Sequence, residues 1–484
     1  MLRPFVTPKK IFGAKKLPYP CDTAIICFCP MPKQFETYSP KKCTERLFLH
    51  IHPEHIRICE RQNFIVIAEV YGGPVSVSVV EELHNYGVTN ILGLGFVGSL
   101  TNDLSMGSNF CSGDSLMEEG TCPHYAIVPK DGYVKCDTNI NTILNTTLKS
   151  HNIWTTNAIY REYDGCVHHA KNLGCDAVNM DTAPLFAACQ KLKMPYCYVA
   201  TVSDVLNHTW ENDLTASVDN GNAAQDELVK TIIGFIPEIN TLSKTDYEKI
   251  EVDVTDAVEK LFIELNICKS HSIDHIKRVL RHTKDALTHE FVSDKIKFLI
   301  SLASILHDAD DTKFTCTESY SNARKIMADK LCEEDIDLVI EMISYVSASV
   351  NGNRIPPRAQ IFPWLLIPRH ADRLEAAGII GVIRCYQFAK TKSMQLYSDA
   401  TSTPRTIDDV WGIATEERYV KYNGQSVTMI DHYYDKLLRI GKFETNNPYL
   451  QEMQSFSLGP LLHVIQLFID GELTDQYFEN LIQN

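Results

Sequence analysis

Hydrophobic and polar positions follow two different patterns along this chain, and the pattern changes near residue 240. Before that point, short apolar runs typical of strands alternate with stretches that carry apolar residues on one helical face. We expect strands over 63–70, 89–95, 175–180 and 195–203, and helices over 74–87, 181–194 and 222–234. This alternation predicts an α/β domain with a mixed or mostly parallel sheet.

After about residue 247, apolar positions recur at i, i+3 and i+4 almost throughout, which predicts an all-α region. The segment 235–248 contains Pro237 and polar residues, as expected of a linker. We therefore expect two domains. The predicted divisions are an N-terminal extension with the first strand (1–45), an α/β domain (46–240), a linker (241–250) and an all-α domain (251–484).

Composition narrows the classes of function. The formal net charge of −15 at pH 7 argues against general nucleic-acid binding, because contact with phosphates needs a basic face. No apolar run reaches the roughly 18 residues of a membrane span, and the N-terminus lacks the apolar core of a secretory signal. The 16 cysteines are scattered, with one C-x-C at Cys27 and Cys29, so we expect free thiols in a reducing, cytoplasmic compartment.

The stretch "ILGLGFVGSL" (91–100) spaces Gly93, Gly95 and Gly98 as G-x-G-x-x-G. A dinucleotide site needs a helix that opens at the third glycine and an acidic residue about 20 positions later. The residues that follow are polar and broken by further glycines. We therefore expect a tight turn that faces a ligand, and we do not expect a nicotinamide cofactor.

Four blocks point to one family. The segments "YGGPVSVSVVEELHNYGVTNILGLGFVGSL" (71–100), "EEGTCPHY" (118–125), "WTTNAIYRE" (154–162) and "AVNMDTAPLFAACQKLKMPYCYVATVSDVL" (177–206) resemble, in order, blocks of the nucleoside phosphorylase/nucleosidase superfamily. The resemblance covers roughly residues 60–235. It implies a three-layer α/β sandwich with a mixed sheet, a nucleoside substrate, and a homo-oligomer formed through this domain.

The same resemblance assigns roles to individual residues. It places Asp204 as the acid that neutralises the leaving base at purine N7, although alone this residue could equally be a helix cap. It places Met180 and Asp181 where the family has Met-Glu, whose carboxylate holds the ribose hydroxyls. The other residues that it implies for the substrate pocket are Gly95, Gly98, Thr121, Tyr160, Arg161 and Ser203. Tyr160 could instead pack in the core.

Two departures from the family bear on the nucleophile. Phosphorylases carry an early G-D-P-x-R, where this chain has "CFCPMPKQ" (27–34), and a phosphate-binding Arg where this chain has Gly93. Loss of a guanidinium removes the bidentate contact that an oxyanion prefers, so water is favoured over phosphate. Inorganic phosphate stays open as a co-substrate, because Arg57 or Arg61, or a neighbouring subunit, could supply the charge.

The second domain contains "HSIDHIKRV" (271–279), "LASILHDADDTKF" (302–314) and "RHADRLEAAGIIGVIR" (369–384). Two imidazoles and two carboxylates suit Mn²⁺, Fe²⁺, Mg²⁺ or Zn²⁺, although any one of these histidines could be structural. Together the segments resemble the H…HD…D pattern of the HD phosphohydrolase superfamily, in a subgroup that includes nucleotide pyrophosphohydrolases. The resemblance implies that the metal ligands are His275, His307, Asp308 and Asp372.

The resemblance also suggests residues around the metal. Asp311 would position or activate water, Lys313 and Arg384 would hold phosphate oxygens, and His271 would touch substrate or a ligand. His370 stands where the subgroup usually has Asp. The metal would lower the pKa of a bound water and polarise a phosphoryl oxygen.

Two hypotheses follow from these patterns. In the first, the chain is a bifunctional enzyme of purine nucleotide breakdown or salvage that cleaves both the glycosidic bond and a phosphate or phosphoanhydride bond. In the second, only the HD domain is catalytic, and the first domain senses nucleosides or forms the oligomer. In both, the partners are small nucleotides and nucleosides, and neither nucleic acid nor membrane is expected.

Overall fold

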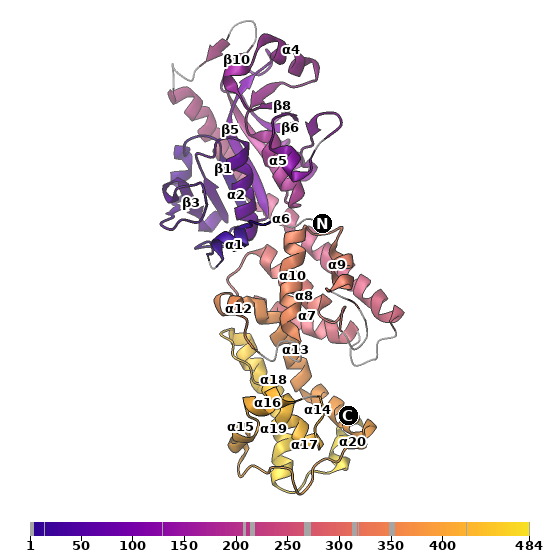
Figure 1. Ribbon diagram of the computed structural model, residues 1–484. Coiled ribbons are helices and arrows are strands. Elements are labelled where there is room, and N and C mark those ends of the chain that lie inside the picture. The colour runs from indigo at the N-terminus through magenta and orange to yellow at the C-terminus, as the bar shows by residue number, and fades with distance from the viewer. Residues whose placement is uncertain are drawn as a thin grey trace. The chain divides into compact units, whose positions relative to one another are not determined.

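The computed structural model describes residues 4–13, 15–127, 129–206, 210–212, 218–265, 273–311, 317, 319–347, 354–422 and 424–483. The chain divides into two compact units (Figure 1). The first comprises Met1–Lys249 with Val292–Ile296, and the second comprises Ile250–Phe291 with Lys297–Asn484. No described helix is both long enough and apolar enough to cross a membrane.

The first unit is built on a mixed sheet of 11 strands. Its centre is β5 (Asn90–Ser99), which pairs in parallel with β1 (Thr23–Cys27) and β10 (Tyr196–Leu206) and antiparallel with β9 (Ala177–Asn179). The other strands are β2 (Lys41–Lys42), β3 (Ile56–Cys59), β4 (Phe64–Ile67), β6 (Asn109–Glu118), β7 (Tyr133–Val134), β8 (Ser150–Thr156) and β11 (Trp210–Asn212). Since β10 also pairs with β6, β6 with β8, and β8 with β9, these four strands and β5 form a closed circuit.

Helices cover both faces of this sheet (Figure 1). Side chains of α2 (Gly73–Asn85) and α5 (Thr182–Lys191) share one apolar core with one face of the strands. Side chains of α3 (Thr138–Leu144) and of α6 (Val218–Glu264) share a second core with the other face. Two shorter helices complete the unit, α1 (Pro8–Phe12) and α4 (Asp164–Asn172). The predicted α/β domain with a mixed sheet is therefore confirmed.

The glycine stretch is a strand, and the predicted ligand-facing turn is wrong. Gly93, Gly95 and Gly98 all lie inside β5. Side chains alternate between the two faces of a strand, so Gly93 and Gly95 leave adjacent gaps on one face. The ring of Tyr198, which pairs with Gly93 in the neighbouring strand, fills these gaps: a Cβ at residue 93 would lie 2.5 Å from its Cδ2, and one at residue 95 only 2.2 Å from its hydroxyl oxygen.

Helix α6 is much longer than the pattern suggested. The sequence predicted a helix over 222–234 and a linker over 241–250, but α6 is helical through both and contains Pro237. Proline inside a helix removes one backbone hydrogen bond. The apolar residues around it outweigh this loss, because Ile232, Ile236 and Ile239 are buried on one face against the sheet.

In the second unit every regular element of the described residues is a helix. The long ones are α7 (Ile273–Leu287), α8 (Asp294–Leu306), α10 (Glu333–Val346), α13 (Ile367–Ala377), α14 (Ile379–Thr391) and α19 (Pro448–Ile469). Helix α13 is central, because it packs against α7, α10, α14 and α19. The predicted helical second domain is confirmed.

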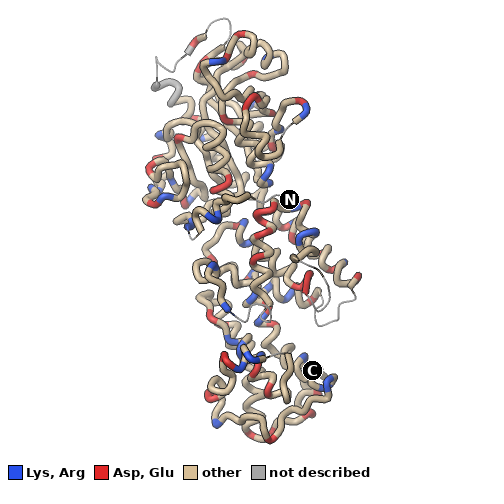
Figure 2. The backbone as a smooth tube through the Cα atoms, viewed as in Figure 1, with Lys and Arg blue, Asp and Glu red and all other residues tan. Residues whose placement is uncertain are grey.

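Shorter helices and turns complete the second unit. They are α9 (Ser321–Met327), α12 (Pro357–Ile361), α15 (Val410–Ile413), α16 (Glu416–Lys421), α17 (Met429–His432), α18 (Leu438–Gly441) and α20 (Asp475–Gln483). Figure 2 shows acidic and basic residues interspersed along the tube of each unit.

Candidate functional site

The first candidate site lies where β5, β9 and β10 end. Asp204 is near the end of β10, opposite Gly98 of β5, at a bulge that shifts the register after Val202. Open α/β sheets place their ligands at the carboxyl ends of parallel strands. Ser203 is the extra residue of this bulge. A bulge changes the direction of the side chains that follow it, here that of Asp204.

Both oxygens of the Asp204 carboxylate already accept hydrogen bonds. The Ser203 hydroxyl donates to Oδ1 at 2.7 Å, and the Trp210 indole N–H donates to Oδ2 at 2.9 Å. Gly98 is required here because a Cβ at that position would lie 3.2 Å from Oδ2 and closer still to Leu206. The predicted pocket residues Ser203 and Gly98 therefore both contact Asp204.

Glu162 is a second carboxyl group at this place, and the motif comparison missed it. It directly follows a short 3₁₀ turn, Ile159–Arg161, and is half-buried. Burial, and next to it the charge of Asp204, raise its pKa to about 7. Glu162 ends the block 154–162, but the resemblance assigned it no role, and only the folded chain lets the charge of Asp204 act on it.

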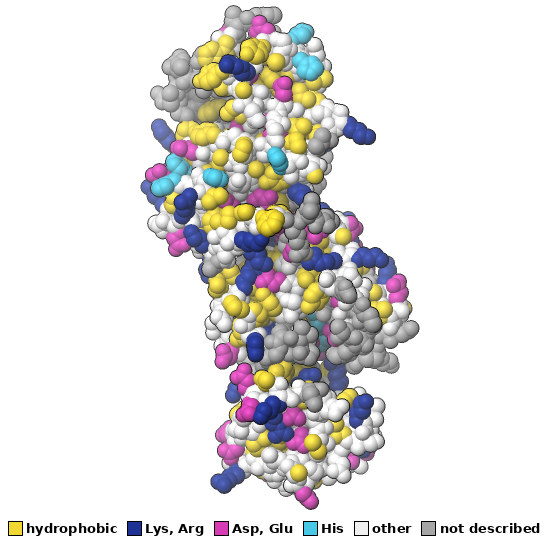
Figure 3. All heavy atoms as spheres, in the orientation of Figure 1, with side chains coloured by type: hydrophobic (Ala, Val, Ile, Leu, Met, Phe, Trp, Pro, Cys, Tyr) yellow, Lys and Arg dark blue, Asp and Glu magenta, His cyan; other side chains and the backbone are white. Residues whose placement is uncertain are grey.

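Tyr160 and Arg161, on the same turn, face away from the protein. The Tyr160 side chain is 88% exposed, and Arg161 Nη1 donates to the Tyr160 carbonyl at 2.8 Å. Neither contacts Asp204 in this conformation. Figure 3 shows hydrophobic side chains on the visible surface of the first unit, and the exposed large ones in this region are Ile159, Tyr160, Tyr163 and Trp210.

Asp181 forms the second half of the site. It lies between β9 and α5, is 7% exposed, and accepts a hydrogen bond from the Gly72 backbone N–H at 3.1 Å. Burial raises the pKa of Asp181 to about 7, and the hydrogen bond from the Gly72 N–H acts in the opposite direction. Thr121 is close by, since a Cβ at Gly73 would lie 2.8 Å from its hydroxyl oxygen. Met180 is half-buried beside Asp181.

Tyr198 occupies the space beside Gly93 and Gly95. It is fully buried, and its ring packs on Phe28 with centroids 5.6 Å apart. Its hydroxyl has no partner at hydrogen-bonding geometry among the described residues, and Asn179 and Asp181 are its polar neighbours. Gly95 thus contacts Tyr198. The tyrosine ring covers the face of β5 to which a side chain at residue 95 would point, so a substrate cannot contact Gly95 from that face.

The arginines proposed as phosphate donors lie elsewhere. Arg57 is on β3, where Glu36 Oε1 accepts from its Nε at 2.9 Å and two backbone carbonyls accept from Nη1. Arg61 follows β3 in a 3₁₀ turn and is exposed. Neither residue is placed at the carboxyl ends of β5 and β10.

The second candidate site is a buried cluster in the helical unit. His275 is on α7, His307 and Asp308 directly follow α8, and Asp372 is on α13. His275 Nε2 lies 3.3 Å from Asp372 Oδ1 and 3.9 Å from Asp308 Oδ2. His307 Nε2 lies 3.5 Å from Asp308 Oδ1 and 3.7 Å from Asp372 Oδ1. The structure therefore brings together all four residues predicted as metal ligands.

The donor set fits a divalent metal. The His307 Nδ1–H donates to the Ser304 carbonyl at 2.8 Å, which leaves the lone pair of Nε2 facing the carboxylates. This buried Nε2 makes no hydrogen bond within the described residues. Burial alone would lower the pKa of His307, but Asp308 and Asp372 outweigh it and raise the pKa. One ligand atom each from His275, His307 and Asp308 falls within 4.8 Å of the others.

A second polar layer lies one helical turn along α7 and α13. Arg278 Nε donates to Glu375 Oε2 at 2.5 Å, and His282 Nε2 lies 3.4 Å from Glu375 Oε1. Arg384, on α14, is half-buried and makes no hydrogen bond or ion pair with another described residue. Burial lowers its pKa, while the charges of Asp372, Glu375 and Asp308 act on it in the opposite direction.

Four more residues were expected around the metal, and the structure treats them differently. Asp311 follows it directly, and its backbone N–H donates to the Asp308 carbonyl at 3.2 Å. Lys313 and His271 lie outside the described residues. His370 does not face the cluster: it is buried, and its ring stacks on Phe443 with centroids 4.2 Å apart.

A family model and several relatives match parts of this chain. A family model described as the phosphorylase superfamily matches residues 24–236. The uncharacterized protein R802 of Acanthamoeba polyphaga mimivirus is 40% identical over 241 residues, which are 48% of this chain and 97% of that protein. The uncharacterized protein L803 of the same virus is 36% identical over 219 residues, 41% of this chain and 88% of that protein.

Among solved structures, the futalosine hydrolase of Helicobacter pylori strain 26695 is 15% identical and covers 44% of this chain and 97% of its own, with a TM-score of 0.36. The family model runs from β1 into the first part of α6, and so contains the strands of the sheet together with Asp181 and Asp204. Residues 24–236 of this chain therefore belong to the phosphorylase superfamily.

Proposed function

We propose that the first unit cleaves the N-glycosidic bond of a purine nucleoside or nucleotide, with water as the nucleophile. The observation that carries this proposal is the pair of carboxyl groups, Asp181 and Asp204, that follow β9 and end β10 on either side of β5. Bond cleavage builds positive charge on the ribose and negative charge on the base. One carboxyl group on each side can stabilise the two developing charges.

Each carboxyl group has a distinct task in this proposal. Asp181, fixed by the Gly72 N–H, holds the ribose hydroxyls and stabilises the cationic sugar. Asp204, fixed by Ser203 and Trp210, faces the leaving base. The water adds to C1′ as the C1′–N bond breaks, so the products are the free base and the free sugar.

The packing of Tyr198 favours water over phosphate. An arginine at position 93 would need the space that the Tyr198 ring fills, so this strand offers no guanidinium for an oxyanion. Arg57 is already engaged by Glu36. If a neighbouring subunit supplied a cation, phosphate would compete with water and ribose 1-phosphate would form.

We propose that the second unit is a metal-dependent phosphohydrolase. The supporting observation is the convergence of His275, His307, Asp308 and Asp372 in one buried cluster. These four residues would hold the divalent cation, Mn²⁺, Mg²⁺, Fe²⁺ or Zn²⁺, which supplies Lewis-acid activation of water and of a phosphoryl oxygen. In this proposal Arg384 and Arg278 bind phosphate oxygens, and the hydrogen bond to Glu375 orients Arg278.

Together the two activities make a bifunctional enzyme of purine nucleotide breakdown or salvage. The second unit removes phosphate or pyrophosphate, and the first unit separates base from sugar. The alternative is a phosphohydrolase whose first unit senses nucleosides or forms a homo-oligomer. The presence of Asp181 in place of the family's Glu favours this alternative, because the shorter side chain reaches less far.

One experiment distinguishes the two proposals. Asp204→Asn and His307→Ala are assayed for both base release and phosphate release, with purine nucleosides and nucleotides, Mn²⁺, and phosphate present or absent. We expect Asp204→Asn to lower base release at least about 100-fold without changing phosphate release. His307→Ala should do the reverse.

The outcomes are separable. Unchanged base release in Asp204→Asn contradicts the glycosidic role of the first unit. Absence of base release in the wild type, with phosphate release intact, supports the sensing alternative. Formation of ribose 1-phosphate that depends on added phosphate would overturn water as the nucleophile.

A further inference from the structure

A chain of polar side chains starts beside the metal cluster and joins three helices of the second unit. His275 and Arg278 on α7 meet Asp372 and Glu375 on α13, with the same spacing in both helices. His275 Nε2 lies 3.3 Å from Asp372 Oδ1, and Arg278 Nε donates to Glu375 Oε2 at 2.5 Å. Residues three apart are neighbours on a helix surface, so Arg278 lies one turn from the cluster.

Arg278 uses one of its three nitrogens in this contact. Its Nη1 and Nη2 groups make no hydrogen bond or ion pair with another described residue. The Arg278 side chain is 30% exposed, whereas that of Glu375 is 10% exposed. A guanidinium that is held at Nε presents its other N–H groups in a fixed plane, which suits the oxygens of a phosphate.

Glu375 is held on its other oxygen. His282, one turn further along α7, places Nε2 3.4 Å from Glu375 Oε1, and its Nδ1 lies 2.7 Å from the Tyr449 hydroxyl oxygen. A carboxylate can only accept, so Nε2 carries a proton toward Glu375, and Nδ1 of the neutral ring accepts from Tyr449. Tyr449 lies in the first turn of α19, which packs against both α7 and α13.

We propose that Glu375, His282 and Tyr449 are positioning residues that hold the Arg278 guanidinium against a phosphate group of the nucleotide beside the metal. A mobile arginine loses side-chain entropy when it binds a ligand, and a carboxylate that is itself fixed removes part of this cost in advance. The inference rests on the proposed phosphohydrolase activity of the second unit. It extends the substrate site to α19, where the sequence predicted no site residue.

Tyr449→Phe tests the far end of this chain, because it removes the hydroxyl and keeps the ring beside His282. In phosphate release with Mn²⁺, KM should rise about fivefold and kcat should change less than about twofold, since a contact made equally in the ground and transition states affects KM alone. Arg278→Lys, which keeps the charge and loses Nε, should raise KM about 30-fold. Because Tyr449 acts through Arg278, adding Tyr449→Phe to Arg278→Lys should raise KM no further.

Ligand binding supplies a readout without turnover. Methylenediphosphonate has a P–C–P link that is not hydrolysed. In calorimetry with Mn²⁺, it should bind about fivefold more weakly to Tyr449→Phe than to the wild type. The rise in Tm with Mn²⁺ alone should be equal in the two proteins, because Tyr449 is not one of the four predicted metal ligands.

Tyr477→Phe is the matched control. Tyr477 also lies beside a histidine of α19, with its ring centroid 5.8 Å from that of His463, but its hydroxyl makes no hydrogen bond with another described residue. Tyr477→Phe should change neither KM nor the binding of methylenediphosphonate. Thermal unfolding of every variant separates loss of the contact from loss of the fold.

Each contrary result has its own meaning. If Tyr449→Phe keeps the KM and the diphosphonate affinity of the wild type, the chain does not reach the ligand, and a lower Tm would then show that it only joins the helices. If the KM effects of Tyr449→Phe and Arg278→Lys multiply, Tyr449 does not act through Arg278. If the wild type releases no phosphate from any nucleotide, the proposed phosphohydrolase fails, while diphosphonate binding still decides whether the chain orients Arg278.

Discussion

At the residue scale, the candidate site of the first unit contains a carboxyl group whose charged form is destabilised by burial. Asp181 is 7% exposed, and the Gly72 N–H is the hydrogen bond that supports its carboxylate. A carboxyl group enclosed in this way favours the protonated form. In the proposed reaction, a cationic sugar lying against Asp181 would favour its charged form again.

This environment makes the stability of the first unit depend on pH. The folded pKa of Asp181 is raised above its unfolded value, so the folded state binds the proton more tightly and stability falls as pH rises from about 4 to about 7. The rise in the pKa of Asp181 from 3.8 to about 7 corresponds to a loss of roughly 4 kcal/mol at most in the free energy of unfolding. Asp181→Asn should therefore unfold at a higher denaturant concentration than the wild type at pH 8, and show little difference at pH 4.

Denaturant unfolding at several pH values checks this expectation, with Asp176→Asn as the control. Asp176 is a half-buried carboxylate next to β9 that is 3.0 Å from His151. Equal pH dependence in the wild type and Asp181→Asn would show that Asp181 is not the destabilising charge.

Four further residues show what a motif can and cannot find. His307 and Asp308 are adjacent in the sequence, and the helical pattern around them suggested one site. Glu162 lies at the end of the block 154–162, but that resemblance assigned roles to Tyr160 and Arg161 and none to Glu162. The family pattern placed His370 in the surroundings of the metal, but it stacks on Phe443, which is 73 positions away and which no local pattern connects to it.

At the element scale, the pairing of β5 with β10 decides what the glycine motif does. Gly93 and Gly95 face the same side of β5, and the Tyr198 ring from β10 lies over both. The glycines are therefore needed for strand packing. A side chain at either position would push the tyrosine away from β5.

Gly95→Ala should destabilise the protein by about 1–3 kcal/mol, because the new Cβ would lie only 2.2 Å from the Tyr198 hydroxyl oxygen. Adding Tyr198→Phe should recover most of this loss, since the clashing atom is removed. Gly165→Ala is the control, because on α4 nothing lies within 4 Å of the place that its Cβ would take. Additive effects of the two substitutions, measured in a double-mutant cycle, would contradict the packing.

Strand β6 shows why one central element was missed. Its sequence "NFCSGDSLME" is polar and contains glycine, which argued against regular structure. In the fold Ser112 and Ser115 are fully buried, and the Ser115 hydroxyl is paired with Thr155 at 2.8 Å. Pairing with β8 and β10 supplies the backbone hydrogen bonds that local propensity did not predict.

At the scale of the whole molecule, the two units carry two separate clusters of ionisable residues. In one, Asp181 follows β9 and Asp204 lies near the end of β10, both beside β5. In the other, residues from three segments of the helical unit converge on one buried point. Each cluster is formed within its own unit, so each activity should be measurable when the other is abolished.

A divalent metal should stabilise the protein only by binding to the cluster in the helical unit. Mn²⁺ at about 100 times its dissociation constant should add about 2.7 kcal/mol to the unfolding free energy, and EDTA should remove it. His307→Ala and Asp372→Ala should lose the rise in Tm, whereas Asp204→Asn should retain it.

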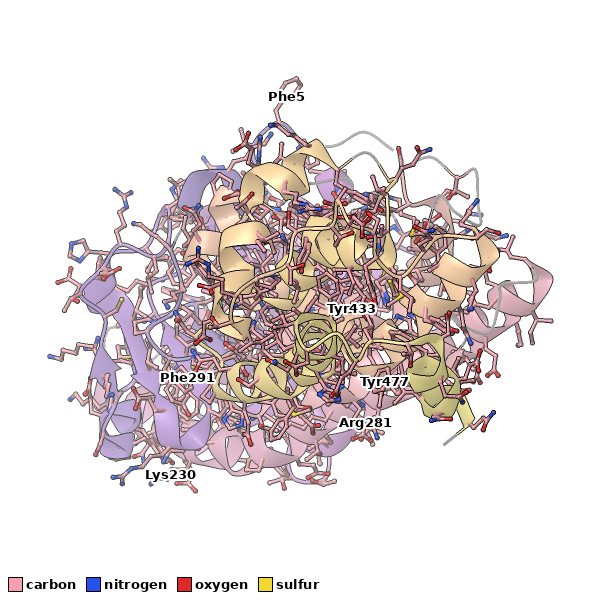
Figure 4. The ribbon with its side chains drawn as sticks, turned by 90° about the horizontal axis from the view of Figure 1, so that it is seen from below. Phe5, Lys230, Arg281, Phe291, Tyr433 and Tyr477 are labelled. Atoms are coloured by element: carbon pink, nitrogen blue, oxygen red, sulfur yellow. The ribbon has the colours of Figure 1, made fainter. Side chains whose placement is uncertain are left out.

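The control residue is Arg281 on α7, labelled in Figure 4 with Tyr433 and Tyr477 of the same unit. Arg281 is exposed and is not one of the four predicted ligands, so Arg281→Gln should respond to Mn²⁺ as the wild type does. A Tm rise in His307→Ala as large as in the wild type would show that the cation binds elsewhere.

The sequence alone determined which parts of the chain are α/β and which are helical, because side-chain period reports the local element directly. The region after residue 250 was predicted as all-α, and the long helix α10 (Glu333–Val346) lies in it. Tertiary structure alone decided the rest. It made the expected glycine turn a strand under Tyr198, extended α6 through Pro237, and stacked His370 on Phe443. These features depend on contacts between residues far apart in the chain, whose free energies outweigh local preference.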